Sequence, residues 1–232
     1  MNLDDFEQLV RSRRAVRRFR PDPVPEETLG RLLEATRWAP SGYNLQPARL
    51  HVVRDEELRG RLFTACLDQK QVREAPCVVV FTGDRKCFRA KRFARILAMD
   101  LEAGAINEQY KSFISQIVPL AFGRAPLGLG GLAKRLMVPA MRFLKPTPDL
   151  PAFQMDFWLA KQVMLGAMNF MLAAHAAGLA TVPMEGFDPV RVRQVLALPR
   201  SETVILVVAL GHEAGEGLTK TRLPLEEYVV EH

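Results

Sequence analysis

The spacing of hydrophobic positions predicts two amphipathic helices near the start of the chain. Over residues 3–12, hydrophobic side chains recur every three or four positions behind acidic residues that suit the positive end of a helix dipole. Prolines in residues 21–25 then break the chain, and Pro25 fits the first turn of a second helix that runs to about Trp38.

The next segment predicts strands that alternate with helices. Residues 48–54 favour a strand, Asp55 is a typical helix cap, and the helix that it begins is expected to continue through Leu67. Residues 77–82 contain a hydrophobic run short enough for a buried strand. This part of the chain therefore predicts a sheet with covering helices.

The last third predicts a long helix, a short helix and a strand. Residues 152–177 are apolar nearly all round in their second half, which indicates burial on every side in a core or a subunit interface. Gly178 can end this helix, and Asp188 with Pro189 begins the next. Residues 203–210 are strongly strand-like. Without a run of βαβ units, the predicted class is α+β, with central strands and helices on both sides.

Residues 85–150 differ in character from the rest. Basic helical patterns are followed by a stretch rich in proline and glycine with weak periodicity. Long irregular segments are usually lids or binding loops. We therefore expect a single domain over residues 1–232, with a variable lid or insertion at about residues 85–150.

Composition excludes several classes of protein. The chain has 232 residues, of which 48% are hydrophobic and 25% charged, values that argue against disordered, collagen-like and disulfide-scaffold proteins. The unpaired pattern of its three cysteines favours a reducing compartment, and the charged start does not predict a signal peptide, so a cytoplasmic protein is expected. The apolar residues 163–184 are interrupted by Asn169 and His175, so no membrane partner is expected.

Net charge of +6 predicts anionic partners, and six arginines lie within residues 11–20. This cluster could be a solvated face, a patch for nucleic-acid phosphates, or a pocket for one phosphorylated ligand. If the chain leaves the helix after residue 12, Arg13, Arg14 and Arg17 could converge on one anion.

Three further segments carry candidate binding groups. In residues 39–47, neutral side chains between two prolines suit hydrogen bonding to a flat heterocycle, although a plain polar loop would also explain them. In residues 181–189, Gly186 lets the backbone approach a ligand closely, unless the segment is only a turn and a helix cap. Lys220 and Arg222 share one face of an extended segment and could grip one phosphate; a basic surface tail is the alternative.

Metal and triad chemistry are not supported by the remaining motifs. The four histidines lack metal-ligand spacing, so no metal is expected, and His175 in an apolar helix is interpreted as a packed core residue. No serine or cysteine pattern around a base indicates a hydrolytic triad.

In order and content, these segments resemble the nitroreductase family of FMN-dependent NAD(P)H oxidoreductases over nearly the whole chain. The matching motifs are residues 13–19, 40–47, 172–179, 183–188 and 220–224. The resemblance implies a mostly antiparallel central sheet in an intertwined homodimer, with FMN sites built from both chains. The cofactor-binding positions carried over are Arg13, Arg14, Ala15, Arg17, Pro40, Ser41, Gly42, Asn44, Gln69, Gln71, Pro183, Met184, Glu185, Gly186, Lys220 and Arg222.

The resemblance also implies a role for each group. Arg13, Lys220 and Arg222 would hold the FMN phosphate, with Arg14 at its phosphate and ribityl end. Arg17 would lie near N1 and O2 of the ring, where its charge stabilises the negative charge left by reduction. The remaining roles are distributed as follows: Gln69 and Gln71 at the pyrimidine ring, Glu185 and Gly186 near N5 through the backbone, and residues 40–44 from the other subunit.

Three positions depart from the family pattern, where Ala15 and Gly42 replace serines and Ala48 replaces an aromatic residue. Loss of the first hydroxyl costs about 1 kcal/mol of FMN binding if nothing replaces it. These departures concern substrate preference rather than the cofactor.

The implied reaction is a ping-pong transfer from NADH or NADPH through FMN to a small acceptor such as a nitroaromatic or a quinone. Dehalogenation, flavin fragmentation and flavin binding without turnover are alternatives. A nucleic-acid-binding protein is the rival from another class, and no nucleic acid is expected as a partner. We expect four aromatic residues to line an open acceptor pocket: Tyr110, Phe113, Phe122 and Phe143.

Overall fold

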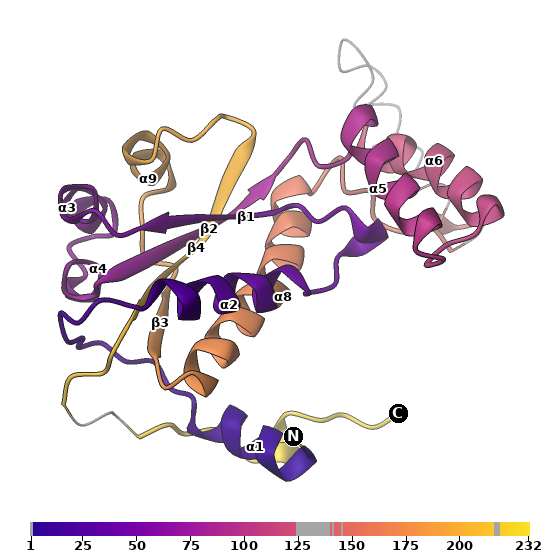
Figure 1. Ribbon diagram of the computed structural model, residues 1–232. Coiled ribbons are helices and arrows are strands. Elements are labelled where there is room, and N and C mark those ends of the chain that lie inside the picture. The colour runs from indigo at the N-terminus through magenta and orange to yellow at the C-terminus, as the bar shows by residue number, and fades with distance from the viewer. Residues whose placement is uncertain (1, 124–139, 141, 145, 216–218) are drawn as a thin grey trace.

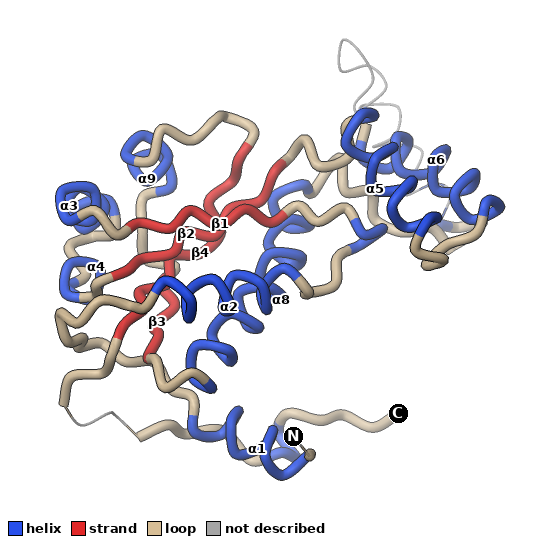
Figure 2. Tube along the Cα trace, viewed as in Figure 1, coloured by secondary structure: helices blue, strands red, loops and turns tan. Residues whose placement is uncertain are grey.

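A four-stranded antiparallel sheet forms the centre of the computed structural model, which describes residues 2–123, 140, 142–144, 146–215 and 219–232 (Figures 1 and 2). The strand order is β1-β2-β4-β3. The strands are β1 (Ala48–Val53), β2 (Cys77–Asp84), β3 (Ala180–Met184) and β4 (Glu202–Gly211), and each neighbouring pair is antiparallel. The predicted α+β class and the antiparallel sheet are confirmed.

Helices cover both faces of this sheet. One face carries α3 (Glu56–Ala65), α4 (Lys70–Glu74) and α9 (Pro189–Val195); the other carries α2 (Glu26–Arg37) and α8 (Met155–Ala176). In β2, Val78 and Val80 pack toward the first group, while Val79 and Phe81 pack toward the second. A strand buried on both faces reads as a continuous hydrophobic run, which explains the pattern of residues 77–82.

Helix α8 crosses the second face of the sheet and forms most of its cover. Leu159, Val163, Ala167 and Phe170 are fully buried, as a helix packed on a sheet requires. In length and hydropathy α8 would suit a membrane crossing, contrary to the expectation for residues 163–184. Central helices of globular folds meet the same criteria, and the buried face of α8 lies against β2, β4 and α2.

Helices α5 (Ala90–Glu102) and α6 (Glu108–Phe122) pack with the start of α8 at one end of the molecule. The expectation that four aromatic residues line one open pocket is wrong. Phe122 is 1% exposed and packs edge-on against Trp158 with ring centroids 4.8 Å apart. Tyr110, Phe113 and Phe143 are exposed instead. Residues 124–139 of the predicted insertion lie outside the described part of the chain.

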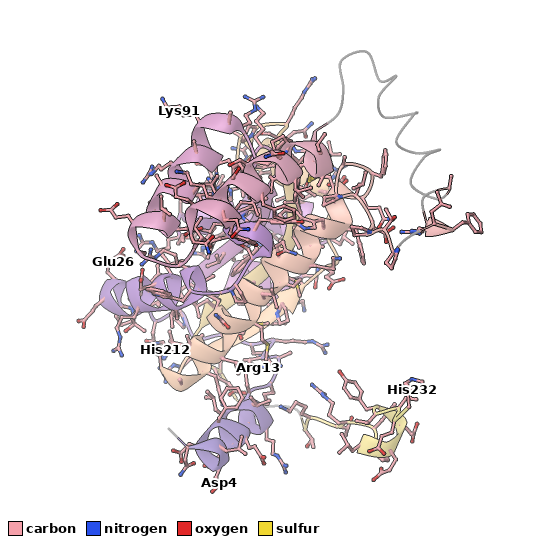
Figure 3. The ribbon with its side chains drawn as sticks, turned by 90° about the vertical axis from the view of Figure 1, so that its right-hand side faces the viewer. Asp4, Arg13, Glu26, Lys91, His212 and His232 are labelled. Atoms are coloured by element: carbon pink, nitrogen blue, oxygen red, sulfur yellow. The ribbon has the colours of Figure 1, made fainter. Side chains whose placement is uncertain are left out.

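At the opposite end, α1 (Leu3–Ser12) lies beside the C-terminal segment, which contains η3 (Leu225–Glu227) and stands away from the sheet (Figures 1 and 3). Residues 221–232 are exposed throughout. The beginning of this segment touches the end of α1 through Lys220, whereas His232 stands apart from α1 (Figure 3).

Two local predictions need correction. The helix after Asp55 ends at Ala65 rather than Leu67, because Leu67 and Asp68 have φ angles of 55° and 54°, outside the helical region. No strand is predicted over residues 180–184, where the structure forms β3. It is short and contains Pro183, which a sheet tolerates because β3 is an edge strand.

Candidate cofactor site

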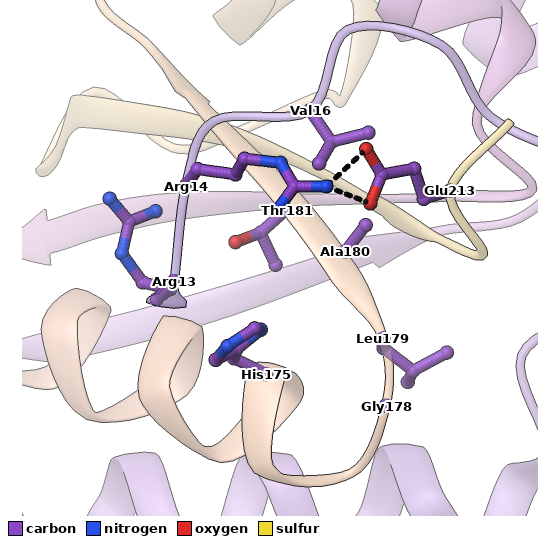
Figure 4. Close-up of a pocket in the computed structure, with 9 residues that line it drawn as sticks. All are labelled: Arg13, Arg14, Val16, His175, Gly178, Leu179, Ala180, Thr181 and Glu213. Atoms are coloured by element: carbon purple, nitrogen blue, oxygen red, sulfur yellow. Dashed lines mark hydrogen bonds and ion pairs between the residues drawn. The ribbon is translucent and has the colours of Figure 1, made fainter. Parts of the chain in front are cut away.

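The arginine-rich segment leaves α1 and runs along the edge of the sheet. α1 ends at Ser12, and Ala15 forms a parallel bridge to Thr181 in β3, with the Val16 amide donating to the Thr181 carbonyl at 3.1 Å. This pairing creates a cavity of about 150 Å³ (Figure 4). Its lining residues are Arg13, Arg14, Val16, His175, Gly178, Leu179, Ala180, Thr181 and Glu213.

Cations from both ends of the chain lie close to Arg13, which lines this cavity, although Lys220 and Arg222 themselves do not line it. Burial, and then the charge of Arg222, lower the pKa of the Arg13 guanidinium. Burial, followed by the charges of Arg13 and Arg222, lowers the pKa of Lys220. The structure therefore brings together the three residues predicted to hold a phosphate, close enough to repel one another.

Unsatisfied donors show what this cluster lacks. Arg13 Nη1 and Arg14 Nε are buried and have no hydrogen-bond partner within the described residues. A buried donor without an acceptor is costly, and an anion with several oxygens would satisfy both the donors and the excess charge. The residues present thus fit a phosphate group.

Lys220 has a more local role than expected. Its Nζ donates to the carbonyl oxygens of Val10 at 2.7 Å and Arg13 at 2.8 Å, which are orphan acceptors at the end of α1. Lys220 therefore fixes the turn that presents Arg13, and its charge stays beside the cavity.

Arg14 is already paired in the structure. Its Nη2 contacts both carboxylate oxygens of Glu213 at 3.0 Å, a contact that spacing could not reveal because 199 positions separate the two residues. Its charge is thus largely balanced before any ligand binds.

Arg17 does not line the cavity with Arg13 and Arg14. Val16 and Phe19 are buried in the core beneath α3, α4 and α9, so the intervening Arg17 and Arg18 face solvent. The expected convergence of Arg13, Arg14 and Arg17 on one anion does not occur within this cavity.

His175 lines the cavity, and its interpretation as a packed core residue is wrong. The side chain is half-buried, and its Nε2 lies 2.8 Å from the Ser12 hydroxyl. Burial, then the charges of Arg13, Arg14 and Lys220, lower its pKa. No local pattern indicates this role, because it depends on the end of α8 packing beside the end of α1.

A second predicted cluster forms at the turn after β3. Gln69 Nε2 donates to the Gly186 carbonyl at 2.6 Å, and Gln71 Nε2 donates to Gln69 Oε1 at 3.0 Å. A side chain at position 186 would bring its Cβ within 3.2 Å of Gln69 Nε2, so glycine permits this approach. The Met184 side chain is buried, which leaves only its backbone for a ligand.

The predicted segment of residues 40–47 lies elsewhere and is satisfied mainly within the chain. It contains η1 (Gly42–Asn44). The Gly42 amide donates to Gln162 Oε1 at 2.7 Å, Asn44 Nδ2 donates to Asp100 Oδ1 at 2.8 Å, and the Ser41 hydroxyl accepts from the Gln46 amide.

Within one chain, the predicted residues around Arg13 lie far from those of the 40–47 segment. The connection between α2 and β1 extends toward α5, while α1 lies at the opposite end (Figure 1). Pro40 and Ser41 line a different cavity, which shares no described residue with the Arg13 cavity. A cofactor that needs both groups would have to lie between two chains.

The antiparallel sheet carries a basic cavity that fits a phosphate group, and comparison with known proteins names the family. The sequence profile of the nitroreductase family matches residues 10–212. An NADH dehydrogenase of Thermus thermophilus is 34% identical over 97% of this chain and 95% of its own length. MhqN of Bacillus subtilis, provisionally named an NAD(P)H nitroreductase, is 26% identical over 98% of both chains. The protein belongs to the nitroreductase family.

Solved structures share the fold. A nitroreductase-like protein from Streptococcus mutans has a TM-score of 0.76 at 24% identity and covers 100% of both chains. A nitroreductase-type protein from Exiguobacterium sibiricum, solved in complex with FMN, has a TM-score of 0.75 at 21% identity, covering 100% of this chain and 99% of its own. Family membership confirms the predicted class, an NAD(P)H-dependent oxidoreductase with FMN as its cofactor.

Proposed function

We propose that the protein transfers electrons from NADH or NADPH to nitroaromatic, quinone or similar small acceptors at an FMN site shared by two copies of the chain. The observation that carries this proposal is that Lys220 and Arg222 lie close to Arg13, which lines a cavity with unsatisfied buried donors. Such a cluster suits a phosphate monoester, the most highly charged part of FMN.

The chain's own residues would bind and orient the cofactor. Arg13 and Arg222 hold the phosphate, and Lys220 keeps Arg13 in place through the end of α1. Arg14 can share its guanidinium between Glu213 and the phosphate or ribityl end through its unpaired Nε.

At the ring end, neutral groups and one cation are available. Gln69 and Gln71, joined to each other and to Gly186, would present an amide edge to the pyrimidine ring. Glu185 and Gly186 offer backbone groups near N5, and the exposed Arg17 is free to approach N1 and O2. A guanidinium there would stabilise negative charge that develops at this edge.

When bound, FMN would supply the hydride chemistry for a ping-pong transfer of electrons from NADH or NADPH to the second substrate. This division explains why the described residues need no catalytic acid or base beyond solvent. We also propose that residues 85–150 form a variable lid on a single domain and contribute to the choice of acceptor.

Exposed apolar side chains support a homodimer. Phe157, Leu165 and Met168 lie toward one side of α8 and are 61%, 46% and 38% exposed. The extended C-terminal segment adds further exposed apolar residues, Leu223, Leu225, Tyr228, Val229 and Val230. Patches of this kind mark protein interfaces, and a second copy would also supply Pro40, Ser41, Gly42 and Asn44 to the FMN site.

A cytoplasmic location fits the free, buried state of Cys66, Cys77 and Cys87. Burial raises the pKa of the Cys87 thiol to about 12, so the thiol stays protonated and unreactive.

The test begins with the purified full-length protein. We expect yellow protein with equimolar FMN, a dimer by light scattering, and bleaching of the flavin by NADH or NADPH under anaerobic conditions. Acceptors are then added singly to the reduced protein to see which restore the colour. Colourless protein that takes up no FMN at micromolar concentration would overturn the proposal, as would a yellow protein that neither NADH nor NADPH reduces.

A further inference from the structure

Positive charge is concentrated at the start of α5, away from the Arg13 cavity. Residues 85–95 contain six cations and no acidic residue: Arg85, Lys86, Arg89, Lys91, Arg92 and Arg95. Arg85 contacts Asp156, whereas none of the other five forms an ion pair with a described residue. The cofactor phosphate does not account for this cluster, because none of the six lines the Arg13 cavity.

One of these cations lines a second cavity. Between the end of α2, the 40–47 segment, α5 and α8 lies a space of about 280 Å³. Its polar lining includes Arg37, Arg49, Arg92, Ser41, Gln46 and Gln162. A charge at a buried position is costly unless it is paired, so the partner of each of these arginines matters.

The charges of the three arginines are compensated unequally. Arg37 pairs with Glu34 at 2.6 Å, and Arg49 pairs with Asp84 at 3.3 Å. Arg92 has only backbone acceptors among the described residues: its Nη2 donates to the carbonyl of Gln46 at 2.6 Å and to that of Leu45 at 3.3 Å.

Arg92 therefore remains a half-buried cation without a counter-ion in the described structure. Its Nε is buried and has no hydrogen-bond partner there. Burial and the nearby charge of Arg49 lower its pKa, in opposition to Asp84. An uncompensated charge in such a place favours entry of an anion, and a planar guanidinium matches the two oxygens of a carboxylate or phosphate.

We propose that this cavity is an anion subsite, in which Arg92 and Arg49 bind a carboxylate or phosphate group of a substrate. This inference rests on the proposed function, because Pro40 and Ser41, which are expected to face the partner's FMN, line the same cavity. Two sources of the anionic group follow from the reaction: an acceptor that carries a carboxylate, or the 2′-phosphate of NADPH.

Matched substrate pairs test the charge requirement and separate the two sources. The acceptor pair is 4-nitrobenzoate against 4-nitrobenzyl alcohol, and the donor pair is NADPH against NADH. For Arg92→Gln we expect kcat/KM to fall about 10-fold or more for the member of one pair that carries the additional anionic group, the carboxylate of 4-nitrobenzoate or the 2′-phosphate of NADPH, because a hydrogen bond to a charged group is lost. The matched member that lacks this group should change less than about twofold, since its complex does not contain the anion that Arg92 binds.

Arg95→Gln is the matched control, because Arg95 is an exposed cation of the same helix that does not line the cavity. It should leave both ratios within about twofold, as expected for an exposed charge. Arg92→Lys should restore part of the discrimination. Equal losses for the members with and without the additional anionic group would overturn the inference and assign Arg92 to holding the Gln46 carbonyl. Equal effects of Arg92→Gln and Arg95→Gln would overturn it as well.

Calorimetric titration of wild-type protein with sodium benzoate, against benzyl alcohol, gives a second measurement that needs neither turnover nor a folded Arg92 variant. Saturable binding of benzoate alone supports the subsite, and equal binding of both overturns it. No binding of benzoate overturns the carboxylate source, and it overturns the subsite as a whole if Arg92→Gln also leaves the ratio of kcat/KM for NADPH and NADH unchanged. The proposed function fails separately, if wild-type protein holds no FMN or if neither NADH nor NADPH reduces its flavin.

Discussion

Replacing Arg13 by glutamine should weaken FMN binding while leaving the cofactor-free fold intact or more stable. Burial, and then the charge of Arg222, lower the pKa of the Arg13 guanidinium. Its Nη1 has no acceptor within the described residues. Without a ligand, the guanidinium therefore opposes the folded state. Its backbone carbonyl, which Lys220 holds at 2.8 Å, is unchanged in Arg13→Gln.

The magnitude follows from the chemistry of the contact. A hydrogen bond to a charged group contributes about 1.5–3 kcal/mol, so its loss raises the Kd of FMN by about 10- to 150-fold. The cofactor-free variant loses one of three mutually repelling cations, and its melting temperature should equal or exceed that of the wild type.

Flavin fluorescence during titration into cofactor-free protein measures the Kd, and thermal unfolding followed by circular dichroism measures stability. The control is Arg11→Gln, which removes an arginine that is 81% exposed and pairs with Glu7 one turn away in α1. It should shift the Kd only through screened, long-range charge. An Arg13→Gln variant that melts lower without FMN and binds FMN as tightly as the wild type would refute the reasoning.

Three further predictions concern stability. The pKa of His175 is lowered from its ordinary 6.5, so acidification protonates this residue in the unfolded chain before it does so in the folded protein. The cofactor-free protein should therefore lose stability between about pH 7 and 5. Urea titrations at these pH values should show a smaller loss for His175→Gln. Gly83→Ala would place a Cβ 2.8 Å from that of Leu159 and should cost about 1–3 kcal/mol, whereas Gly60→Ala, with nothing within 4 Å, should stabilise α3 by about 0.5–1 kcal/mol, both measured by urea unfolding. Asp188→Ala removes a cap that accepts from two amides at 2.9 and 3.2 Å and should lower the free energy of unfolding by about 1 kcal/mol in the same assay; no change would contradict the cap.

Local signals in the sequence identified most of the elements. The caps Asp55 and Asp188 accept hydrogen bonds from the first turns of α3 and α9, as their positions before those helices predict. β1, β2 and β4 were found because each depends on a hydrophobic run of its own. The family was identified in the same way, since its motifs are short and occur in order along the chain.

The sequence could not place residues whose roles depend on distant partners. β3 is stable as an edge strand because it pairs with β4. Phe122 is buried because α6 packs on Trp158, and its own neighbours in sequence do not reveal that contact.

The site shows the same division between sequence and tertiary structure. The resemblance of short motifs to the nitroreductase family indicated a phosphate ligand for Arg13, Lys220 and Arg222. Only the packed structure decided that Lys220 holds the end of α1, that Glu213 pairs with Arg14, and that His175 reaches Ser12 across 163 positions of sequence. The reason is physical: caps and periodicity act over a few residues, whereas a charged cavity exists only where sheet pairing and helix packing bring remote segments together.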